Sequence, residues 1–158
     1  MKIIEIMEFK ESDIDKIYEI QKAAYKPLYE KYHDDCSNPY MESKETILHK
    51  YMREGTRGYV FMKDGSIVGA VRIIFQPESN SGRVSALAVH PQYQGQGIAQ
   101  HALLEIEKLH SDTNKWYLDT IMQESGNCYL YEKIGYRRTG KIEEINEKMT
   151  LVFYEKIV

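Results

Sequence analysis

The chain has little cysteine, little net charge and no long apolar run. Its two cysteines, Cys36 and Cys128, are too few for a disulfide framework. Acidic residues nearly balance basic ones, with a net charge of −3 at pH 7, so no electrostatic surface for nucleic acid is expected. No apolar stretch approaches the ~20 residues that a membrane span requires. We therefore expect neither a nucleic-acid partner nor a membrane partner.

The length and composition favour one globular domain that spans residues 1–158. Hydrophobic residues make up 42% of the chain and charged residues 28%, which is ordinary for a folded domain. The sequence contains no internal repeat, low-complexity segment or interdomain linker. The first residues, MKIIEIMEF, lack the basic and then apolar layout of a secretory signal, so a cytoplasmic location is expected.

Hydrophobic periodicity predicts an α+β fold with a largely antiparallel sheet that includes one parallel βαβ unit. A first helix capped by Ser12 ends before Pro27, an irregular polar loop follows, and Ser43 starts a second helix. Another helix begins at Ser125 or Gly126. The expected strands, apart from the one described next, are residues 2–9, 57–63, 66–75, 115–121, 136–142 and 148–157, with Asp64-Gly65 as a hairpin turn.

Residues 84–99, which read VSALAVHPQYQGQGIA, form the most informative stretch. Strand-forming residues lead to Pro91, Gly95 and Gly97 permit backbone angles that side chains disfavour, and helical periodicity starts at Ile98. A helix N-terminus carries unpaired N–H groups and about half a positive charge. The turn from Gln94 onward is therefore suited to a pyrophosphate, and a phosphate-bearing cofactor is expected.

The same turn resembles the cofactor motif of the GNAT superfamily of acetyl-CoA-dependent N-acetyltransferases. In that motif, Gln or Arg is followed by x-x-Gly-x-Gly or Ala, and Gln94, Gly97 and Ala99 match it. The later run LYEKIGY, residues 130–136, resembles the second signature of the family. The resemblance implies a twisted sheet of about seven strands with about four flanking helices. It places the cofactor between two parallel strands that splay apart, here those that hold Leu87 and Leu118.

The resemblance also assigns residues to acetyl-CoA. The backbone of Leu87, Ala88 and Val89 would pair with the pantetheine arm. The pyrophosphate would lie on the amides of Gln94, Gly95, Gln96, Gly97, Ile98 and Ala99. Relatives often carry an asparagine seven residues before the signature tyrosine, whereas this chain has Glu124 there and its asparagine at Asn127. Two interpretations of Asn127 remain, a cofactor contact from another turn of the helix or a helix cap.

Acetyl transfer to an amine needs an acid for the departing thiolate and a base for the amine. Tyr131 matches the tyrosine that commonly protonates the coenzyme A sulfur in the family, and a phenol is suited to that role. The strand before the turn offers no carboxylate, so the candidates for the base are Glu124, His90, Asp119 and an ordered water. Cys128 is interpreted as a small buried hydrophobe, and the histidines have no metal-ligand spacing, so no metal is expected.

The acceptor would enter from the face opposite the cofactor, which the resemblance builds from the first two helices and the last strand turn. This region is acidic and rich in tyrosine, and we take Tyr29, Tyr32, Asp34 and Asp35 as candidate substrate residues. They favour a cationic amine such as a polyamine, an amino sugar or a lysine of a peptide, and the alternative is an ordinary solvated helix surface. With a polycation as acceptor, the rate should fall as salt rises.

The sequence thus predicts an N-acetyltransferase that moves the acetyl group of acetyl-CoA to a primary amine by direct attack. The acceptor is expected to be a small molecule or a peptide, and a homodimer is expected by analogy with similar folds. The competing hypothesis is a non-catalytic acyl-CoA sensor or interaction module on the same fold, which would bind the cofactor without releasing a thiol.

Overall fold

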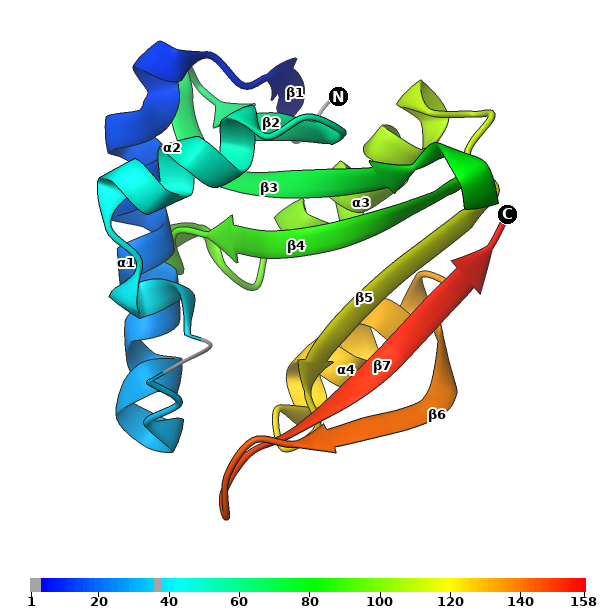
Figure 1. Ribbon diagram of the computed structural model, residues 1–158. Helices are drawn as coiled ribbons and strands as arrows, with labels where there is room; N and C mark the ends of the chain where they lie inside the picture. Colours follow the sequence, from blue (N-terminus) through cyan, green and yellow to red (C-terminus); the bar gives the residue numbers. More distant parts are fainter. Residues whose placement is uncertain (1–3, 36–37) are drawn as a thin grey trace.

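A seven-stranded sheet with the strand order β1-β2-β3-β4-β5-β7-β6 forms the centre of the molecule in a computed structural model that describes residues 4–35 and 38–158 (Figure 1). Cys36 and the start of the first expected strand lie outside the described residues. The strands are β1 (Glu5–Glu8), β2 (Thr56–Lys63), β3 (Ser66–Gln76), β4 (Ser81–Val89), β5 (Lys115–Ile121), β6 (Arg137–Glu144) and β7 (Thr150–Ile157). The helices are α1 (Ile14–Tyr32), α2 (Lys44–Met52), α3 (Ile98–Leu109) and α4 (Ser125–Lys133). The predicted α+β class and element order are confirmed.

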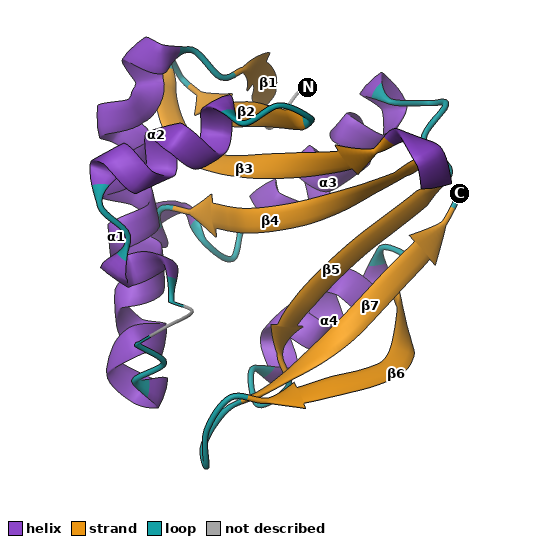
Figure 2. Ribbon diagram, in the orientation of Figure 1, coloured by secondary structure: helices purple, strands orange, loops and turns teal. Residues whose placement is uncertain are grey.

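The sheet is antiparallel except where β4 meets β5. These two strands pair in parallel only from Ser81–Lys115 to Arg83–Tyr117 and then diverge. Figure 2 shows the resulting V, with α1 across its open end. The predicted splayed pair of parallel strands is therefore confirmed, and it creates an opening in the middle of the sheet.

Helices cover both faces of the sheet, so the central strands are buried on both sides. Helices α1 and α2 lie over β2 and β3 on one face, where Ile17, Ile47 and Val60 pack together. Helices α3 and α4 lie on the other face (Figure 2). The larger core there includes Val71, Ile73, Ile98, Leu103, Ile106, Trp116, Leu118, Cys128, Tyr136 and Tyr154. No helix in the described part of the chain is long and apolar enough to cross a membrane.

The first helix corrects two predictions. Asp13, not Ser12, occupies the N-cap position of α1, and the helix continues through Pro27 to Tyr32 instead of stopping before the proline. A proline inside a helix costs about 3 kcal/mol or more because it removes a hydrogen bond and crowds the preceding turn. Packing opposes that cost, since Tyr32 joins a buried cluster with Ile121 and Met149 from the far arm of the V.

A bulge interrupts β4 where the opening begins to widen. Arg72 pairs with Ser85 and Ala70 with Ala88, so the β4 side carries one more residue than the β3 side. The bulge includes Ala86, whose φ of 51° is one that residues other than glycine rarely adopt. The sequence does not predict this bulge, because no glycine or proline marks it.

Candidate active site

In the described part of the chain, the edge of β4 that faces the opening has no strand partner beyond Arg83. Two of its carbonyls nevertheless have donors from this chain. The Tyr25 hydroxyl donates to the Leu87 carbonyl at 2.6 Å, and Gln94 Nε2 donates to the Val89 carbonyl at 2.9 Å. The sequence predicts that this strand edge pairs with a ligand arm through both kinds of backbone group. With these two carbonyls occupied, an added strand would depend mainly on the N–H groups of Leu87 and Val89, because Ala88 pairs with Ala70 of β3.

The glycine turn forms an anion cradle at the end of β4. Gly95 and Gly97 have φ angles of 79° and 80°, and Gly97 is the N-cap of α3. Within the described ranges, the amides of residues 95–100 have no hydrogen-bond acceptor. Because these donors gather at the positive end of a helix dipole, they can hold a phosphate group. The Gln94 side chain helps fix the turn through its bond to Val89.

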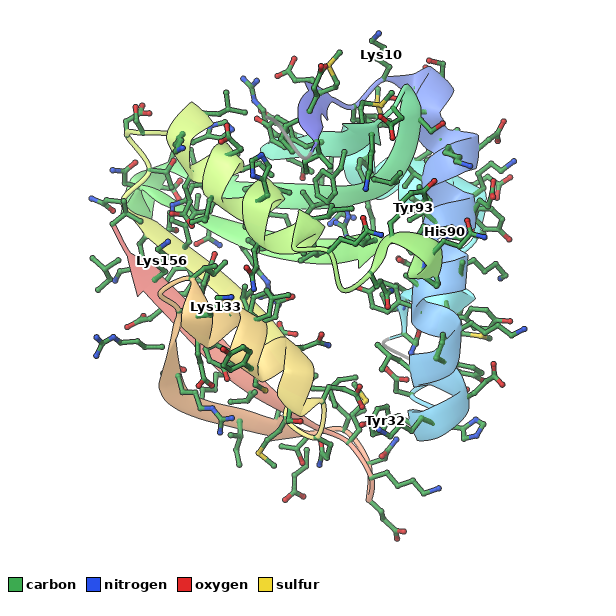
Figure 3. All side chains as sticks on the ribbon, turned by 180° about the vertical axis from the view of Figure 1, so that it is seen from behind. Lys10, Tyr32, His90, Tyr93, Lys133 and Lys156 are labelled. Carbon is green, nitrogen blue, oxygen red and sulfur yellow. The ribbon has the colours of Figure 1, made fainter. Side chains whose placement is uncertain are left out.

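Lys63 is a cation beside this turn that the sequence does not predict. Lys63 at the end of β2 donates to Gln96 Oε1 at 2.7 Å, and its ammonium lies 5.7 Å from the centre of the Tyr93 ring. Figure 3 shows Tyr93 in the segment that follows β4. Lys63 is far from the turn in sequence, and a lone lysine before a hairpin carries no functional signal. Its charge adds to the positive field of the cradle.

Tyr131 lies on α4 with its ring near Tyr136 and Tyr154, at centroid distances of 6.1 and 6.3 Å. Burial raises the pKa of Tyr131 well above its usual value, and the charge of Asp119 raises it further. Burial likewise raises the pKa of Tyr25, with added contributions from Tyr131 and Asp119. Tyr25, Tyr131 and Asp119 therefore lie close enough together to affect the ionisation of the two phenols, although they come from three elements.

Asp119 is the base candidate whose pKa moves toward neutrality. It lies on β5, two residues beyond the last β4–β5 pair, and its side chain is 23% exposed. Arg83 Nη2 donates to Asp119 Oδ2 at 2.5 Å. Burial raises the pKa of Asp119, and the opposing charge of Arg83 does not cancel that effect. A carboxylate with a raised pKa is a stronger base than an exposed one.

Glu124 has the opposite environment. Lys31 Nζ donates to Glu124 Oε2 at 2.8 Å, and the Tyr32 hydroxyl donates to the same oxygen at 2.5 Å. Burial by itself would raise the pKa of Glu124, but these two hydrogen bonds lower it overall. Figure 3 shows Tyr32 near the lower end of α1, where these contacts join it to the start of α4. Glu124 therefore ties the two arms of the V together.

His90 lies at the end of β4 and caps a short turn. Its Nδ1 accepts the backbone N–H of Gln92 at 3.2 Å, which leaves Nε2 as the remaining ring nitrogen. Figure 3 places His90 beside α1, next to Tyr93. Because its Nδ1 caps the turn, the geometry of His90 favours a structural role over the role of the base.

Each of the four candidate acceptor residues has a hydrogen-bond partner within the chain. Tyr29 and Tyr32 lie on α1, not in the predicted loop, because the helix continues through Pro27. The Tyr29 hydroxyl donates to Asp35 Oδ1 at 2.5 Å, and Asp34 is buried and accepts from Asn38 Nδ2 at 2.9 Å. These carboxylates are therefore engaged within the segment that links α1 and α2.

Asn127 is not a helix cap. It is the third residue of α4, and Glu124 occupies the N-cap position without a side-chain cap bond. The Asn127 side chain is exposed, and its backbone N–H donates to the Glu124 carbonyl at 3.1 Å. The helix-cap interpretation is therefore wrong, and the cofactor contact stays a prediction.

A cavity of about 270 Å³ lies beside the β4–β5 junction. Its lining includes Arg83, Tyr117, Lys141 and Phe153, and the Lys141 ammonium stacks over the Phe153 ring at 4.4 Å from the centroid. Because Arg83 also binds Asp119, this cavity adjoins the opening. Two of the residues that line this cavity, Arg83 and Lys141, are cationic.

The splayed sheet leaves a strand edge open, and the turn after β4 gathers backbone amides suited to a phosphate group. The model of the Acetyltransferase (GNAT) family matches residues 14–136, so the chain belongs to that family and is an N-acetyltransferase by family. A Bacillus subtilis protein described as uncharacterized, YrkN, is 26% identical over 128 residues, which cover 80% of this chain and 69% of that protein.

Solved structures share the fold. The PaiA N-acetyltransferase of Thermoplasma acidophilum, in complex with coenzyme A, has a TM-score of 0.79 at 21% identity, with 100% of both chains covered. The spermidine N-acetyltransferase of Vibrio cholerae, in complex with CoA and spermine, has a TM-score of 0.79 at 18% identity, covering 98% of this chain and 95% of that one. At these identities the likeness establishes the fold and leaves the acceptor open.

Proposed function

We propose that this protein transfers the acetyl group of acetyl-CoA to a primary amine by direct attack. The observation that carries the proposal is the grouping of Tyr131 and Asp119 at the opening between β4 and β5, together with the amide cradle that follows β4. The residues fit the cofactor, because those amides lack acceptors within the described ranges, and a Cβ at Gly95 or Gly97 would meet no protein atom within 4 Å. The space above the turn is open to a phosphate.

The residues divide the work as follows. The amides of residues 95–100 bind the pyrophosphate, Lys63 adds positive charge, and the β4 edge at residues 87–89 orients the pantetheine arm. Bound acetyl-CoA supplies the activated acetyl group as a thioester. Asp119 accepts a proton from the ammonium form of the acceptor at its carboxylate, which frees the nitrogen lone pair for attack.

Tyr131 acts at the other end of the reaction. As the bond from the carbonyl carbon to nitrogen forms and the bond to sulfur breaks, its hydroxyl donates a proton to the departing thiolate, and the second proton that the acylated nitrogen loses restores the phenol. The raised pKa keeps the phenol protonated at neutral pH. Burial disfavours a phenolate, but it also disfavours a thiolate in the same opening. Moving the proton from the phenol to the sulfur therefore replaces one disfavoured anion with another and carries no extra desolvation cost.

An amine panel separates this proposal from a non-catalytic sensor. We expect thiol release from acetyl-CoA in the presence of at least one class of primary amine, measured with a thiol-reactive dye. Coenzyme A binding is measured in parallel by calorimetry. A protein that binds coenzyme A but releases no thiol with any amine would be a sensor, and the proposal would be wrong.

Gly97→Ala tests the cradle. We expect the dissociation constant for coenzyme A to rise about 10-fold or more, because an alanine at a φ of 80° is strained and its methyl group enters the space above the turn. Gly140→Ala is the matched control, since Gly140 also has a positive φ, 96°, and open space around it, but lies on β6. Both variants should lose similar thermal stability. Equal effects of the two variants on the dissociation constant would argue against the cradle.

A further inference from the structure

Arg72 is a buried cation that no carboxylate among residues 4–35 and 38–158 contacts. It lies in the middle of β3 and is only 8% exposed. Its Nη2 donates to Ser85 Oγ at 3.2 Å, and its guanidinium carbon lies 5.9 Å from the centre of the Tyr51 ring. Glu42 is near enough to act on its pKa, but Glu42 accepts instead from Lys50 and Gln21. A buried guanidinium without an anion is costly, because desolvation penalises its charge.

Most of the donors of Arg72 remain unused. A guanidinium has five N–H groups, and Ser85 Oγ is the one acceptor that it finds among residues 4–35 and 38–158. In the same ranges, the only fully buried side-chain nitrogen or oxygen without a partner is Trp116 Nε1. The free N–H groups of Arg72 therefore reach solvent. A guanidinium at the edge of an apolar layer is suited to a carboxylate, because its planar donors can form a bidentate pair of hydrogen bonds with the two carboxylate oxygens.

Arg72 is also close to the reaction site along the sheet. Its pairing partner Ser85 immediately precedes Ala86, where the β4 bulge begins, and its charge acts on Tyr25, which bonds to the Leu87 carbonyl. Arg83, which holds Asp119, is two residues before Ser85, so the two side chains point to the same face of β4. Two residues of strand span roughly 7 Å. A cationic group and the proposed base thus flank one short stretch of β4.

We propose that Arg72, supported by Ser85, binds a carboxylate of the acceptor, so that the substrates are small molecules with an amine and a carboxylate a few bonds apart, such as free amino acids. The proposal rests on the acetyl transfer proposed above and adds the class of acceptor. Asp119 would receive the ammonium end and Arg72 the carboxylate end. A polycation is disfavoured here, because it would approach Arg72 and the neighbouring charge of Arg53.

The experiment compares matched acceptors in wild type and three variants. Each common L-amino acid is tested beside its carboxamide and its decarboxylated amine, with spermidine as a polycation, and kcat/KM is measured by thiol release. Arg72→Met removes the donors at similar volume, and Arg72→Lys keeps the charge without the planar donor set. Arg53→Met is the control, because it removes an exposed positive charge nearby. Thermal unfolding and coenzyme A binding verify that each variant is folded.

We expect wild type to prefer at least one amino acid over its carboxamide by about 10- to 100-fold, as a charged hydrogen-bond pair provides. Arg72→Met should remove most of that preference, Arg72→Lys should retain part of it, and Arg53→Met should leave it intact. Comparing the same two compounds between proteins cancels the different amine pKa values of acid and amide. Equal use of acid and amide by wild type, a preference for spermidine, or a preference that survives Arg72→Met would overturn the proposal.

A readout without catalysis separates this proposal from the proposed function. If no amine releases thiol, the acetyl transfer is wrong, and calorimetry of amino acids against the coenzyme A-loaded protein still tests the carboxylate site. Binding of an amino acid to wild type that weakens about 10-fold or more in Arg72→Met would support the site. Absence of binding to wild type, or equal binding to both proteins, would refute it.

Discussion

Tyr131→Phe should lower kcat about 100-fold or more while the dissociation constant for coenzyme A stays within about twofold of wild type. The change removes one hydroxyl from a ring that packs against Tyr136 and Tyr154, so the packing of α4 is preserved. Loss of a positioned general acid typically lowers a rate by 10²- to 10⁴-fold. The measurement is steady-state thiol release together with calorimetric binding of coenzyme A.

Tyr129→Phe is the control for this prediction. Tyr129 lies on the same helix and is 67% exposed, so the same chemical change there should leave kcat near the wild-type value. A further check uses an acetyl thioester with a more acidic thiol, which needs less protonation as it leaves. The deficit of Tyr131→Phe should shrink with that donor. Wild-type kcat in Tyr131→Phe would remove Tyr131 from the acid role.

Asp119→Asn should also lower kcat/KM about 100-fold or more near neutral pH. A base acts in its deprotonated form, so the wild-type rate should rise as pH increases through the raised pKa of Asp119. The variant should lose that rise and keep only the pH dependence of the amine itself. The measurement is kcat/KM across the pH range for wild type and variant with one acceptor.

Stability measurements distinguish this loss from misfolding. Because the folded state raises the pKa of Asp119, it favours the protonated form, and the resulting stabilisation disappears as pH rises through that pKa. At neutral pH the ionised carboxylate is therefore unfavourable, and Asp119→Asn should unfold at the wild-type temperature or above. Glu124→Gln is the control, because the lowered pKa of Glu124 keeps it ionised, and its removal should weaken the tie to Lys31 and Tyr32 without altering the pH profile. An unchanged pH profile in Asp119→Asn would assign the base elsewhere.

Local sequence patterns were sufficient to predict the structure where a few adjacent residues determine the backbone conformation. The Asp64-Gly65 turn has both φ angles positive, as the dipeptide predicts, and the helix after Gly97 begins at Ile98 as expected. These features depend on backbone angles that glycine and aspartate tolerate, so the sequence nearby contains the necessary information. The predicted strand 115–121 also matches β5, whose strand-forming side chains Trp116, Leu118 and Ile121 are buried.

Long-range packing decided the features that local patterns missed. Pro27 predicts a helix end, yet α1 continues because Tyr32 packs on Ile121 and Met149, which are distant in sequence. The same extension moved Tyr29 and Tyr32 from a predicted loop onto a helix. The bulge at Ala86 arises from the register between β3 and β4, which no short window of sequence contains.

By itself, the sequence determined the family-like cofactor turn, the order of the elements and the position of Tyr131, because each is written in a contiguous motif. Only the tertiary structure gives two of the base candidates different pKa values, since burial raises the pKa of Asp119 against the charge of Arg83, whereas hydrogen bonds from Lys31 and Tyr32 lower that of Glu124. It also showed that Arg72 is buried and contacts no carboxylate in the described part of the chain, which is the basis of the proposed acceptor class. Burial and charge pairing depend on chain segments far apart in sequence, and these exist only once the sheet has formed.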